Sequence, residues 1–144
     1  MDDIQSDRNE HTFTDKMMKL SKRAEKTFWG KLGCELLSVT TNRAIISLEA
    51  ESEHLNLLGI VHGGVYMSLM DNAMGLVVMS DAQNERVVTA TMNTHFLASC
   101  SGGKLYCKAA LLHRTKRSIT LQAEVEDEKG QLLAWSSGLY RIVT

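Results

Sequence analysis

Hydrophobic and polar positions divide the chain into segments with different periods. From Thr14, apolar residues recur at helical spacing with Lys and Arg between them, and Gly30 is expected to end this helix. The apolar positions are Met17, Leu20, Ala24 and Phe28. Residues 1 to about 12 are polar and are expected to be frayed.

The segment from Leu32 to Ala50 changes to the alternation of β-strands. Polar residues 40–42, Thr-Thr-Asn, are expected to form the turn of a hairpin. The alternating apolar positions after that turn are Ala44, Ile46 and Leu48. Residues 51 to 61 show no regular period.

The fifteen residues from Val65 to Met79 are rich in helix formers and are apolar around most of a helix's circumference. Such a segment is too long for a typical strand and too short to span a bilayer. A helix that is apolar all round is normally buried. We therefore predict a central, buried helix that begins near His62.

Four strand-like runs follow a loop at 81–85, and the segments between the runs are rich in turn-forming residues. The runs are 86–98, 104–113, 117–127 and 131–143, with turns at 101–103, 114–116 and 127–130. Strict alternation in the first run places Val88, Ala90, Met92 and Phe96 on one face and Thr89, Thr91, Asn93 and His95 on the other. We expect the four strands in meander order, within one antiparallel sheet that curls around the helix.

Composition limits the class of protein. The 144 residues suit one domain, and 44% hydrophobic with 23% charged residues is ordinary for a globular protein. We therefore predict a single domain over 1–144, with 1–30 as an N-terminal extension. The net charge of −1 argues against a nucleic-acid partner, which requires a surplus of cations.

The cysteines predict a cytoplasmic protein. Cys34, Cys100 and Cys107 are an odd number without metal-ligand spacing, which favours a reducing compartment and no structural metal. The polar N-terminus, residues 1–5, does not resemble a secretory signal, and no segment approaches a membrane span.

Two features of the predicted helix indicate chemistry. Asp71 is a carboxylate within an apolar segment, which is costly to bury unless it is paired or lies at a cleft. At the helix start, His62-Gly63-Gly64 allows close backbone approach to a ligand, and first-turn amides can bind a developing oxyanion. Alternatively, Asp71 lies on a solvent-facing stripe and the glycines only form the turn into the helix.

The spacing of these residues predicts a site shared between two chains. His62 and Asp71 are nine residues apart, which is about 13 Å of helical rise and close to half a turn. If both act on one bond, a second copy of the chain must supply one of them, as a symmetric dimer can.

The segment Asn56–Asp71, NLLGIVHGGVYMSLMD, resembles the signature of hotdog-fold acyl-CoA thioesterases of the PaaI-like type. The resemblance continues through 88–93, VTATMN, and covers about residues 30–143. It implies an α+β hotdog fold, in which a curved antiparallel sheet wraps around a central helix, and hydrolysis of an acyl-CoA to CoA and a free acid.

The resemblance also implies residue roles. Asp71 would be the general base or the nucleophile, and the Gly63 N–H would bind the carbonyl oxygen. Asn56 would position water or the thioester, His62 would assist beside it, and Thr89 would orient the water. In this family the Asp and Thr come from one subunit and the Asn, His and Gly from its partner.

Coenzyme A is expected to contact Gly64 and the cations of one turn, which are Arg114, Lys116 and Arg117. A solvated charged turn is the alternative. The resemblance implies no metal or other cofactor, no membrane partner, and a homodimer that often pairs into a tetramer. Two other functions stay open, an acyl-CoA-binding module without hydrolysis and a hotdog dehydratase or hydratase, although the His-Gly-Gly…Asp pattern fits the latter poorly.

Overall fold

The computed structural model describes residues 15, 17–81 and 86–143. The chain forms two compact units that meet in sequence at Gly33, residues 1–33 and 34–144. The expected frayed segment, the expected helix start at Thr14 and most of the expected 81–85 loop lie outside the described residues.

The N-terminal unit contains two short helical segments where the sequence pattern predicts one helix. Residues 17–24 are helical, a turn follows, and α2 spans Phe28–Leu32. The prediction that Gly30 ends the helix is wrong, because Gly30 lies inside α2 and Gly33 caps it with a φ of 92°. Gly30 serves close packing instead, since a Cβ there would lie 1.9 Å from the Glu25 carbonyl oxygen.

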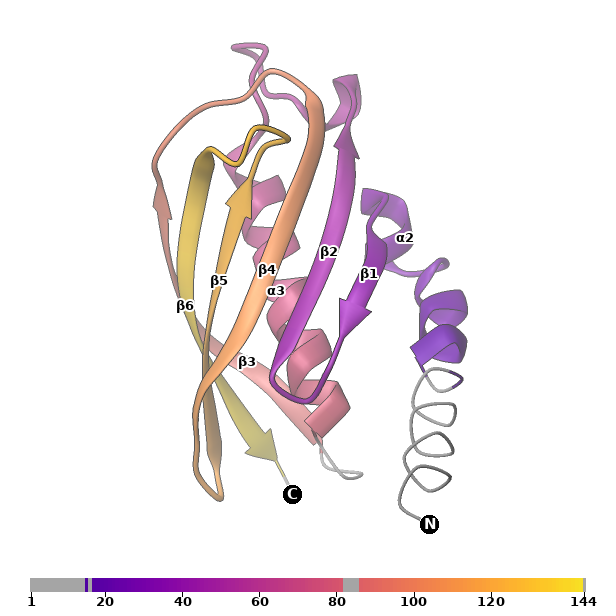
Figure 1. Ribbon diagram of the computed structural model, residues 1–144, viewed down its shortest axis with the longest axis vertical. Helices are drawn as coiled ribbons and strands as arrows, with labels where there is room; N and C mark the ends of the chain where they lie inside the picture. Colours follow the sequence, from indigo (N-terminus) through magenta and orange to yellow (C-terminus); the bar gives the residue numbers. More distant parts are fainter. Residues whose placement is uncertain (1–14, 16, 82–85, 144) are drawn as a thin grey trace. The chain divides into compact units, whose positions relative to one another are not determined.

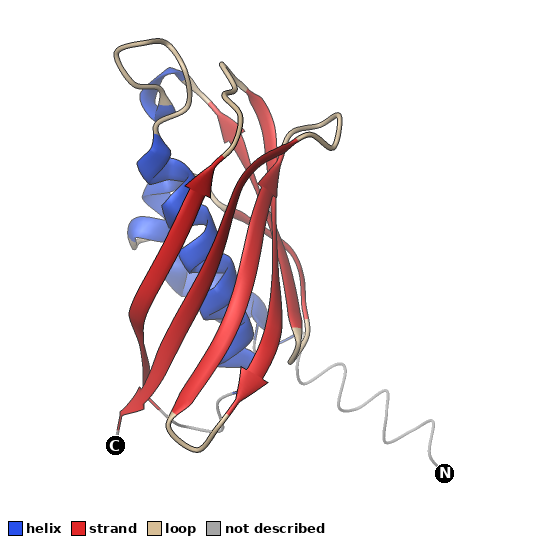
Figure 2. Cartoon of the chain, turned by 90° about the vertical axis from the view of Figure 1, so that its left-hand side faces the viewer, coloured by secondary structure: helices blue, strands red, loops and turns tan. Residues whose placement is uncertain are grey.

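The second unit is a six-stranded antiparallel sheet with one long helix against it (Figures 1 and 2). Its helices are the short η1 (Ser52–His54) and the long α3 (Gly63–Asp81). Its strands are β1 (Glu35–Val39), β2 (Arg43–Ala50), β3 (Arg86–Phe96), β4 (Gly103–Arg114), β5 (Ser118–Glu126) and β6 (Leu132–Val143). The predicted hairpin, central helix and four later strands are therefore confirmed, as is a curved antiparallel sheet around a helix.

The predicted meander order is wrong for β3. The sheet order is β1-β2-β4-β5-β6-β3, so β3 pairs with β6 at the far edge, while β4 pairs with β2. Alternation along a chain identifies a strand and its faces, but the packing of the whole sheet decides which strands pair. As a result, β3 is an edge strand that lies beside α3 and has β6 on one side only.

Helix α3 buries one face and leaves the other partly open. The buried residues form adjacent pairs that recur every four residues, as expected for one face of a helix. They are Val65, Tyr66, Leu69, Met70, Ala73, Met74, Val77 and Val78. Met67 and Met79 lie outside this set and are 39% and 46% exposed, so the sheet of one chain covers most of the helix but leaves these two side chains open. Within the described part of the chain, no helix is long and apolar enough to cross a membrane.

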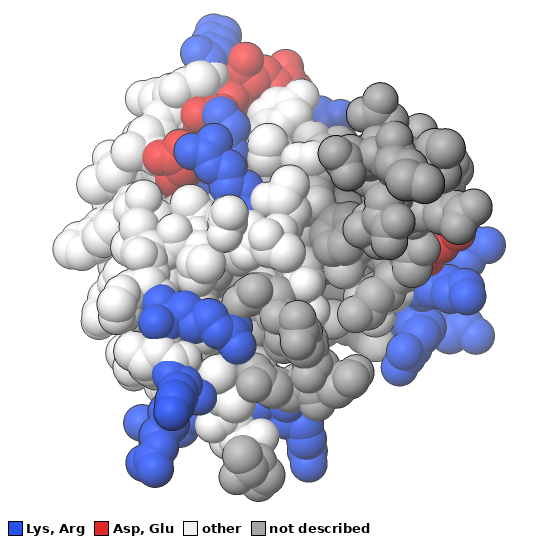
Figure 3. Space-filling view, turned by 60° about the horizontal axis from the view of Figure 1, so that its bottom comes forward, with Lys and Arg blue, Asp and Glu red and all other residues white. Residues whose placement is uncertain are grey.

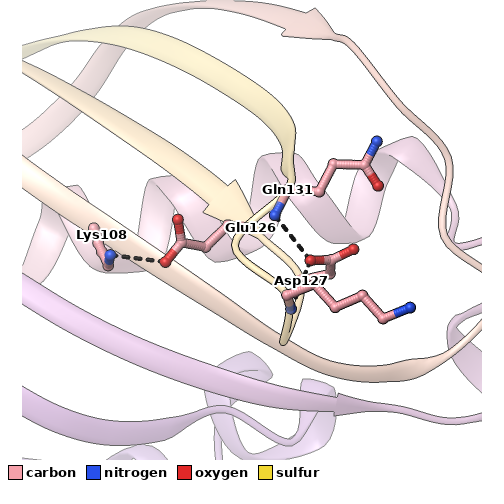
Figure 4. A network of polar contacts seen from close by, with 5 residues as sticks. Lys108, Glu126, Asp127 and Gln131 are labelled. Carbon is pink, nitrogen blue, oxygen red and sulfur yellow. Dashed lines mark hydrogen bonds and ion pairs between the residues drawn. The ribbon is translucent and has the colours of Figure 1, made fainter.

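The β5–β6 turn is held by Asp127, as the turn-prone sequence there predicts (Figure 4). Its Oδ1 accepts hydrogen bonds from the backbone N–H groups of Lys129 and Gln131, each at 2.9 Å. Next to it, Lys108 Nζ of β4 and Glu126 Oε1 of β5 form an ion pair at 2.7 Å. The Lys108 side chain is exposed and that of Glu126 is half-buried, so the pair is largely screened by solvent and contributes little to stability.

Two buried thiols predict a protein that loses stability at alkaline pH. Burial raises the pKa of Cys34 from 9.0 to about 11 and that of Cys107 well above 9.0. The native state then keeps protons that the unfolded chain releases above pH 9, so the free energy of unfolding falls as pH rises from 9 towards 11. We expect the melting temperature at pH 10 to lie several degrees below that at pH 7.5.

Cys107→Ala should reduce this alkaline loss, because it removes one of the two buried thiols. Cys100→Ala, which keeps both, is the matched control and should follow wild type. Thermal melts over pH 7–11 measure the effect, and identical slopes for wild type and Cys107→Ala would contradict the interpretation.

Candidate active site

Asp71 accepts hydrogen bonds from two hydroxyl groups, and does not simply lie on a solvent-facing stripe of the helix. Its Oδ1 accepts hydrogen bonds from the Tyr140 hydroxyl at 2.6 Å and from Thr89 Oγ1 at 2.9 Å. The other oxygen, Oδ2, receives no hydrogen bond from any residue that the structure describes. The carboxylate is therefore fixed through one oxygen, and its second oxygen is available to a water molecule or substrate.

Tyr140 is a site residue that sequence reasoning missed. It is 3% exposed on β6, and its single hydroxyl hydrogen is shared between Asp71 Oδ1 and the Asp71 backbone carbonyl oxygen, which lies 3.1 Å from the phenol oxygen. Burial, followed by the hydrogen bond and charge of Asp71, raises the Tyr140 pKa, so the phenol remains a donor at neutral pH. Its only signal was its place opposite Thr89, which is not visible without the strand register.

Thr89 reaches Asp71 because β3 contains a bulge. Thr89 pairs with Tyr140 and Thr91 with the adjacent Leu139, so Ala90 is an extra residue. A bulge reverses the alternation of faces along a strand. Strict alternation predicts Thr89 and Phe96, which are seven residues apart, on opposite faces of β3. Both contact α3, so this prediction is wrong.

His62 caps the start of α3. Its Nδ1 accepts a hydrogen bond from the Gly64 backbone N–H at 2.8 Å, which satisfies one of the unpaired amides of the first turn. An accepting Nδ1 in a neutral imidazole places the ring proton on Nε2. The Gly64 amide therefore has an acceptor within the chain, and the predicted contact of Gly64 with coenzyme A stays a prediction.

Gly64 leaves the space that this cap needs. A Cβ at position 64 would lie 2.9 Å from His62 Nδ1 and would push the ring away from the amide. We expect Gly64→Ala to destabilise the protein by about 1 kcal/mol, the usual loss for an N-cap. Chemical denaturation measures this change.

Gly75→Ala is the matched control for Gly64→Ala. Gly75 also lies in α3, but a Cβ there meets no atom within 4 Å. Glycine inside a helix is destabilising by about 0.5–1 kcal/mol relative to alanine, so this change should stabilise the protein. Equal effects of the two substitutions would contradict the role of Gly64.

The Gly63 amide faces no protein acceptor. Gly63 is the first residue of α3, and within the described ranges its N–H donates to no other group. Gly63 lines a pocket of about 340 Å³ together with Asn56, Tyr66 and Phe96. A free first-turn amide in a pocket can bind a carbonyl oxygen or an oxyanion.

Asn56 holds the loop that leads into this pocket. Its Oδ1 accepts from the backbone N–H groups of Leu58 at 2.9 Å and Ile60 at 3.4 Å. Its Nδ2 makes no hydrogen bond within the described part of the chain. The side chain therefore positions the loop through its oxygen and can offer its amide hydrogens to a ligand.

The predicted site residues form two groups within one chain. Asn56, His62 and Gly63 lie at the start of α3, whereas Asp71 and Thr89 meet partway along it. Gly63 and Asp71 are eight residues apart, which is about 12 Å of helical rise. The structure of one chain thus does not bring the carboxylate to the free amide.

The basic turn lies at the other end of the sheet from Gly64. Ser80, near the end of α3, donates to the Thr40 carbonyl, and the Leu111 amide donates to Asn42, so β4 runs to the end where α3 finishes. Arg114, Lys116 and Arg117 follow there and are exposed. Figure 3 views this end and shows Lys and Arg side chains on its surface.

The fold and these two groups together define a class of protein. A curved antiparallel sheet lies around one helix, which carries a hydrogen-bonded carboxylate and starts with an unpaired amide. This is the arrangement expected of hotdog-fold thioesterases. A family model described as the thioesterase superfamily matches residues 58–134, more than half of the chain. The chain therefore belongs to the thioesterase superfamily, and the predicted hotdog fold and PaaI-like resemblance are confirmed.

Several relatives support this assignment. Rv1847 of Mycobacterium tuberculosis is 28% identical over 111 residues, covering 74% of this chain and 79% of its own, and its structure has a TM-score of 0.78. A 1,4-dihydroxy-2-naphthoyl-CoA hydrolase of Listeria monocytogenes is 26% identical, over 73% of this chain and 86% of the relative. A mutant of the phenylacetic acid degradation protein PaaI from Thermus thermophilus has a TM-score of 0.76 at 25% identity, over 81% of this chain and 98% of that one. The superfamily and its relatives make the protein a thioesterase-type hydrolase.

Proposed function

We propose that the protein hydrolyses the thioester of an acyl-CoA to CoA and a free carboxylic acid. The observation that carries this proposal is the Asp71 carboxylate, held at Oδ1 by two hydroxyl donors with Oδ2 open. The unpaired Gly63 amide supports it, as does the similarity to a relative named as a CoA-thioester hydrolase.

The proposed chemistry needs only a carboxylate and an amide. Asp71 takes a proton from water as the water oxygen bonds to the thioester carbon, and the Gly63 N–H binds the oxyanion that forms. The intermediate collapses, the C–S bond breaks, and CoA leaves as a thiolate that takes a proton. In the alternative route Asp71 attacks the carbonyl carbon, the C–S bond breaks and CoA leaves as a thiolate, and water then hydrolyses the mixed anhydride to the free acid and the Asp71 carboxylate.

A homodimer would complete this site. Thr89 contacts Asp71 and Phe96 lies at Gly63, seven residues further along β3, so roughly 20 Å of strand separates the two groups. Strand β3 is one of the two edge strands of the sheet, the other being β1. Antiparallel pairing of two copies of β3 would place the Thr89 end of each beside the Phe96 end of the other.

The same pairing would bring the basic turn of one copy towards the pocket of the other. In an antiparallel pair the end of one sheet that carries Arg114, Lys116 and Arg117 lies beside the α3 start of its neighbour. These cations could then bind the phosphates of CoA. Two such dimers would form the tetramer that the resemblance implies.

We also propose a cytoplasmic location without a nucleic-acid partner. All three cysteines are free thiols, which suits a reducing compartment. The net charge of −1 provides no general attraction for phosphate backbones.

Thiol release from a panel of short, medium, long and aryl acyl-CoAs tests the proposed activity. Turnover of one class would support the proposal and would name the acyl group. If the protein binds these esters and cleaves none of them, the proposal is wrong and a binding module is the better account. The same panel should include enoyl-CoAs, because their hydration would indicate a hydratase.

A shared site predicts that two inactive variants restore each other. Asp71→Asn loses the carboxylate and Gly63→Pro loses the amide, so a mixed dimer has one intact site and one site with both changes. After refolding an equal mixture, half of the dimers are mixed, and activity should return to about a quarter of wild type. Mass spectrometry of intact dimers confirms exchange, and exchange without recovered activity would exclude a shared site.

A further inference from the structure

The helical segment at 17–33 concentrates positive charge. It has five cations and one acid, a net charge of +4, although the whole chain has a net charge of −1. The cations are Lys19, Lys22, Arg23, Lys26 and Lys31. All five residues are exposed, and none forms an ion pair with a residue that the structure describes. The segment therefore presents a basic surface on a chain that is otherwise acidic.

The first helix of this segment, residues 17–24, has a covered apolar face and an open basic face. Met17 is 4% exposed, whereas Met18 is 59% exposed. Met18 and Lys22 are four residues apart, as are Lys19 and Arg23, so the members of each pair are neighbours on the helix surface. The open face thus combines three cations with one apolar side chain.

Two aromatic residues follow in α2. Phe28 is 62% exposed and Trp29 is half-buried, and both lie between Lys26 and Lys31 in the sequence. Cations beside exposed aromatic and apolar side chains are typical of segments that lie in the interface of a membrane. There the cations face anionic headgroups, and the apolar side chains enter the boundary with the acyl chains.

Membership of the thioesterase superfamily does not account for this segment. The family model matches residues 58–134, and the PaaI-like resemblance, which implies no membrane partner, covers about residues 30–143. The two groups of site residues begin at Asn56. The exposed cations at 17–33 therefore lie outside the parts of the chain that the family and the site define.

We propose that the 17–33 segment binds the surface of an anionic phospholipid membrane. Its five cations contact the headgroups, and Met18 and Phe28 enter the interface. Charge complementarity selects this occupant, since each Lys or Arg near an anionic leaflet adds to the attraction, and the cytoplasmic leaflet is negative. A nucleic acid would also attract the cations but offers no acyl boundary for Met18. This inference goes beyond the proposed hydrolysis and does not depend on it.

Vesicle flotation of the full chain tests the proposal. Wild type should bind vesicles of phosphatidylcholine with about 30% phosphatidylserine at least about tenfold more tightly than vesicles of phosphatidylcholine alone. Salt at about 0.5 M should remove most of this binding, because it screens the charges. Equal binding to the two kinds of vesicle, or binding to neither, would overturn the proposal. So would tighter binding to duplex DNA than to the anionic vesicles at the same salt concentration.

A triple substitution of the basic face separates the segment from the net charge. Replacing Lys19, Lys22 and Arg23 by Gln should weaken binding to anionic vesicles about tenfold or more. The control replaces by Gln three exposed cations that are spread over the sheet, which are Arg43, Lys129 and Arg141. It lowers the net charge equally and should stay within about twofold of wild type. Equal losses in the two variants, with wild-type melting temperatures, would overturn the proposal.

Tryptophan fluorescence tests the apolar contact. The chain has two tryptophans, Trp29 and Trp135, so Trp135→Phe leaves Trp29 as the reporter and Trp29→Phe leaves Trp135 of β6 as the control. Anionic vesicles should shift the Trp29 emission to shorter wavelength, and brominated acyl chains should quench it, while Trp135 stays unchanged. Binding without any change at Trp29 would overturn the interfacial contact. None of these measurements uses a thioester, so their outcome is independent of whether the protein hydrolyses one.

Discussion

Asp71→Asn should lower kcat/KM for acyl-CoA hydrolysis by at least about a hundredfold, the usual scale for loss of a general base. Asparagine keeps an acceptor oxygen for the Tyr140 and Thr89 hydroxyls, which now bond to Asp71 Oδ1. It cannot take a proton from water and is a far weaker nucleophile than a carboxylate. The melting temperature should therefore stay close to wild type while thiol release falls.

Glu126→Gln is the control for loss of a carboxylate as such. The half-buried Glu126 pairs with the exposed Lys108, outside both groups of site residues. Its replacement should leave thiol release unchanged. If Asp71→Asn retains more than a tenth of wild-type activity, the carboxylate is neither base nor nucleophile, and the mechanism needs another residue.

Gly63→Pro should reduce kcat about a hundredfold to a thousandfold, the loss expected when an oxyanion donor is removed. Proline has no N–H, yet it is favoured at the first position of a helix. Gly63 occupies that position in α3, so the helix start should survive the change. The comparison is made by thiol release at saturating acyl-CoA.

Gly63→Ala separates the loss of the amide from the added bulk. A Cβ at position 63 would lie 3.1 Å from Phe96 Cε1, a tight contact that both variants share. The Phe96 side chain is 53% exposed and can yield, so alanine should cost only a few-fold in kcat. Equal losses in the proline and alanine variants would assign the effect to crowding and would remove Gly63 from the mechanism.

Local sequence patterns predict most of the elements of this fold. The apolar segment at 65–79 and the turn-separated runs after it correspond to α3 and to strands β3–β6. Asp71 and Gly63 could also be identified from the sequence, because a carboxylate in an apolar helix and a glycine at its start are visible without a structure. Strand order could not be predicted, since the pairing of β3 with β6 depends on contacts between residues far apart in sequence.

The site residues that depend on register could not be predicted. Thr89 lies on the wrong face by strict alternation and reaches Asp71 only through the extra residue Ala90. Tyr140 enters the site because it stands opposite Thr89.

The extra residue in β3, Ala90, determines which face of the sheet the side chains at each end of that strand occupy. Deletion of Ala90 would restore regular alternation, and one end of β3 would then turn its side chains to the opposite face. Either Thr89 would point away from Asp71, or Phe96 would leave the pocket wall at Gly63. The loss or gain of one residue between Thr89 and Phe96 is thus excluded while both contacts persist.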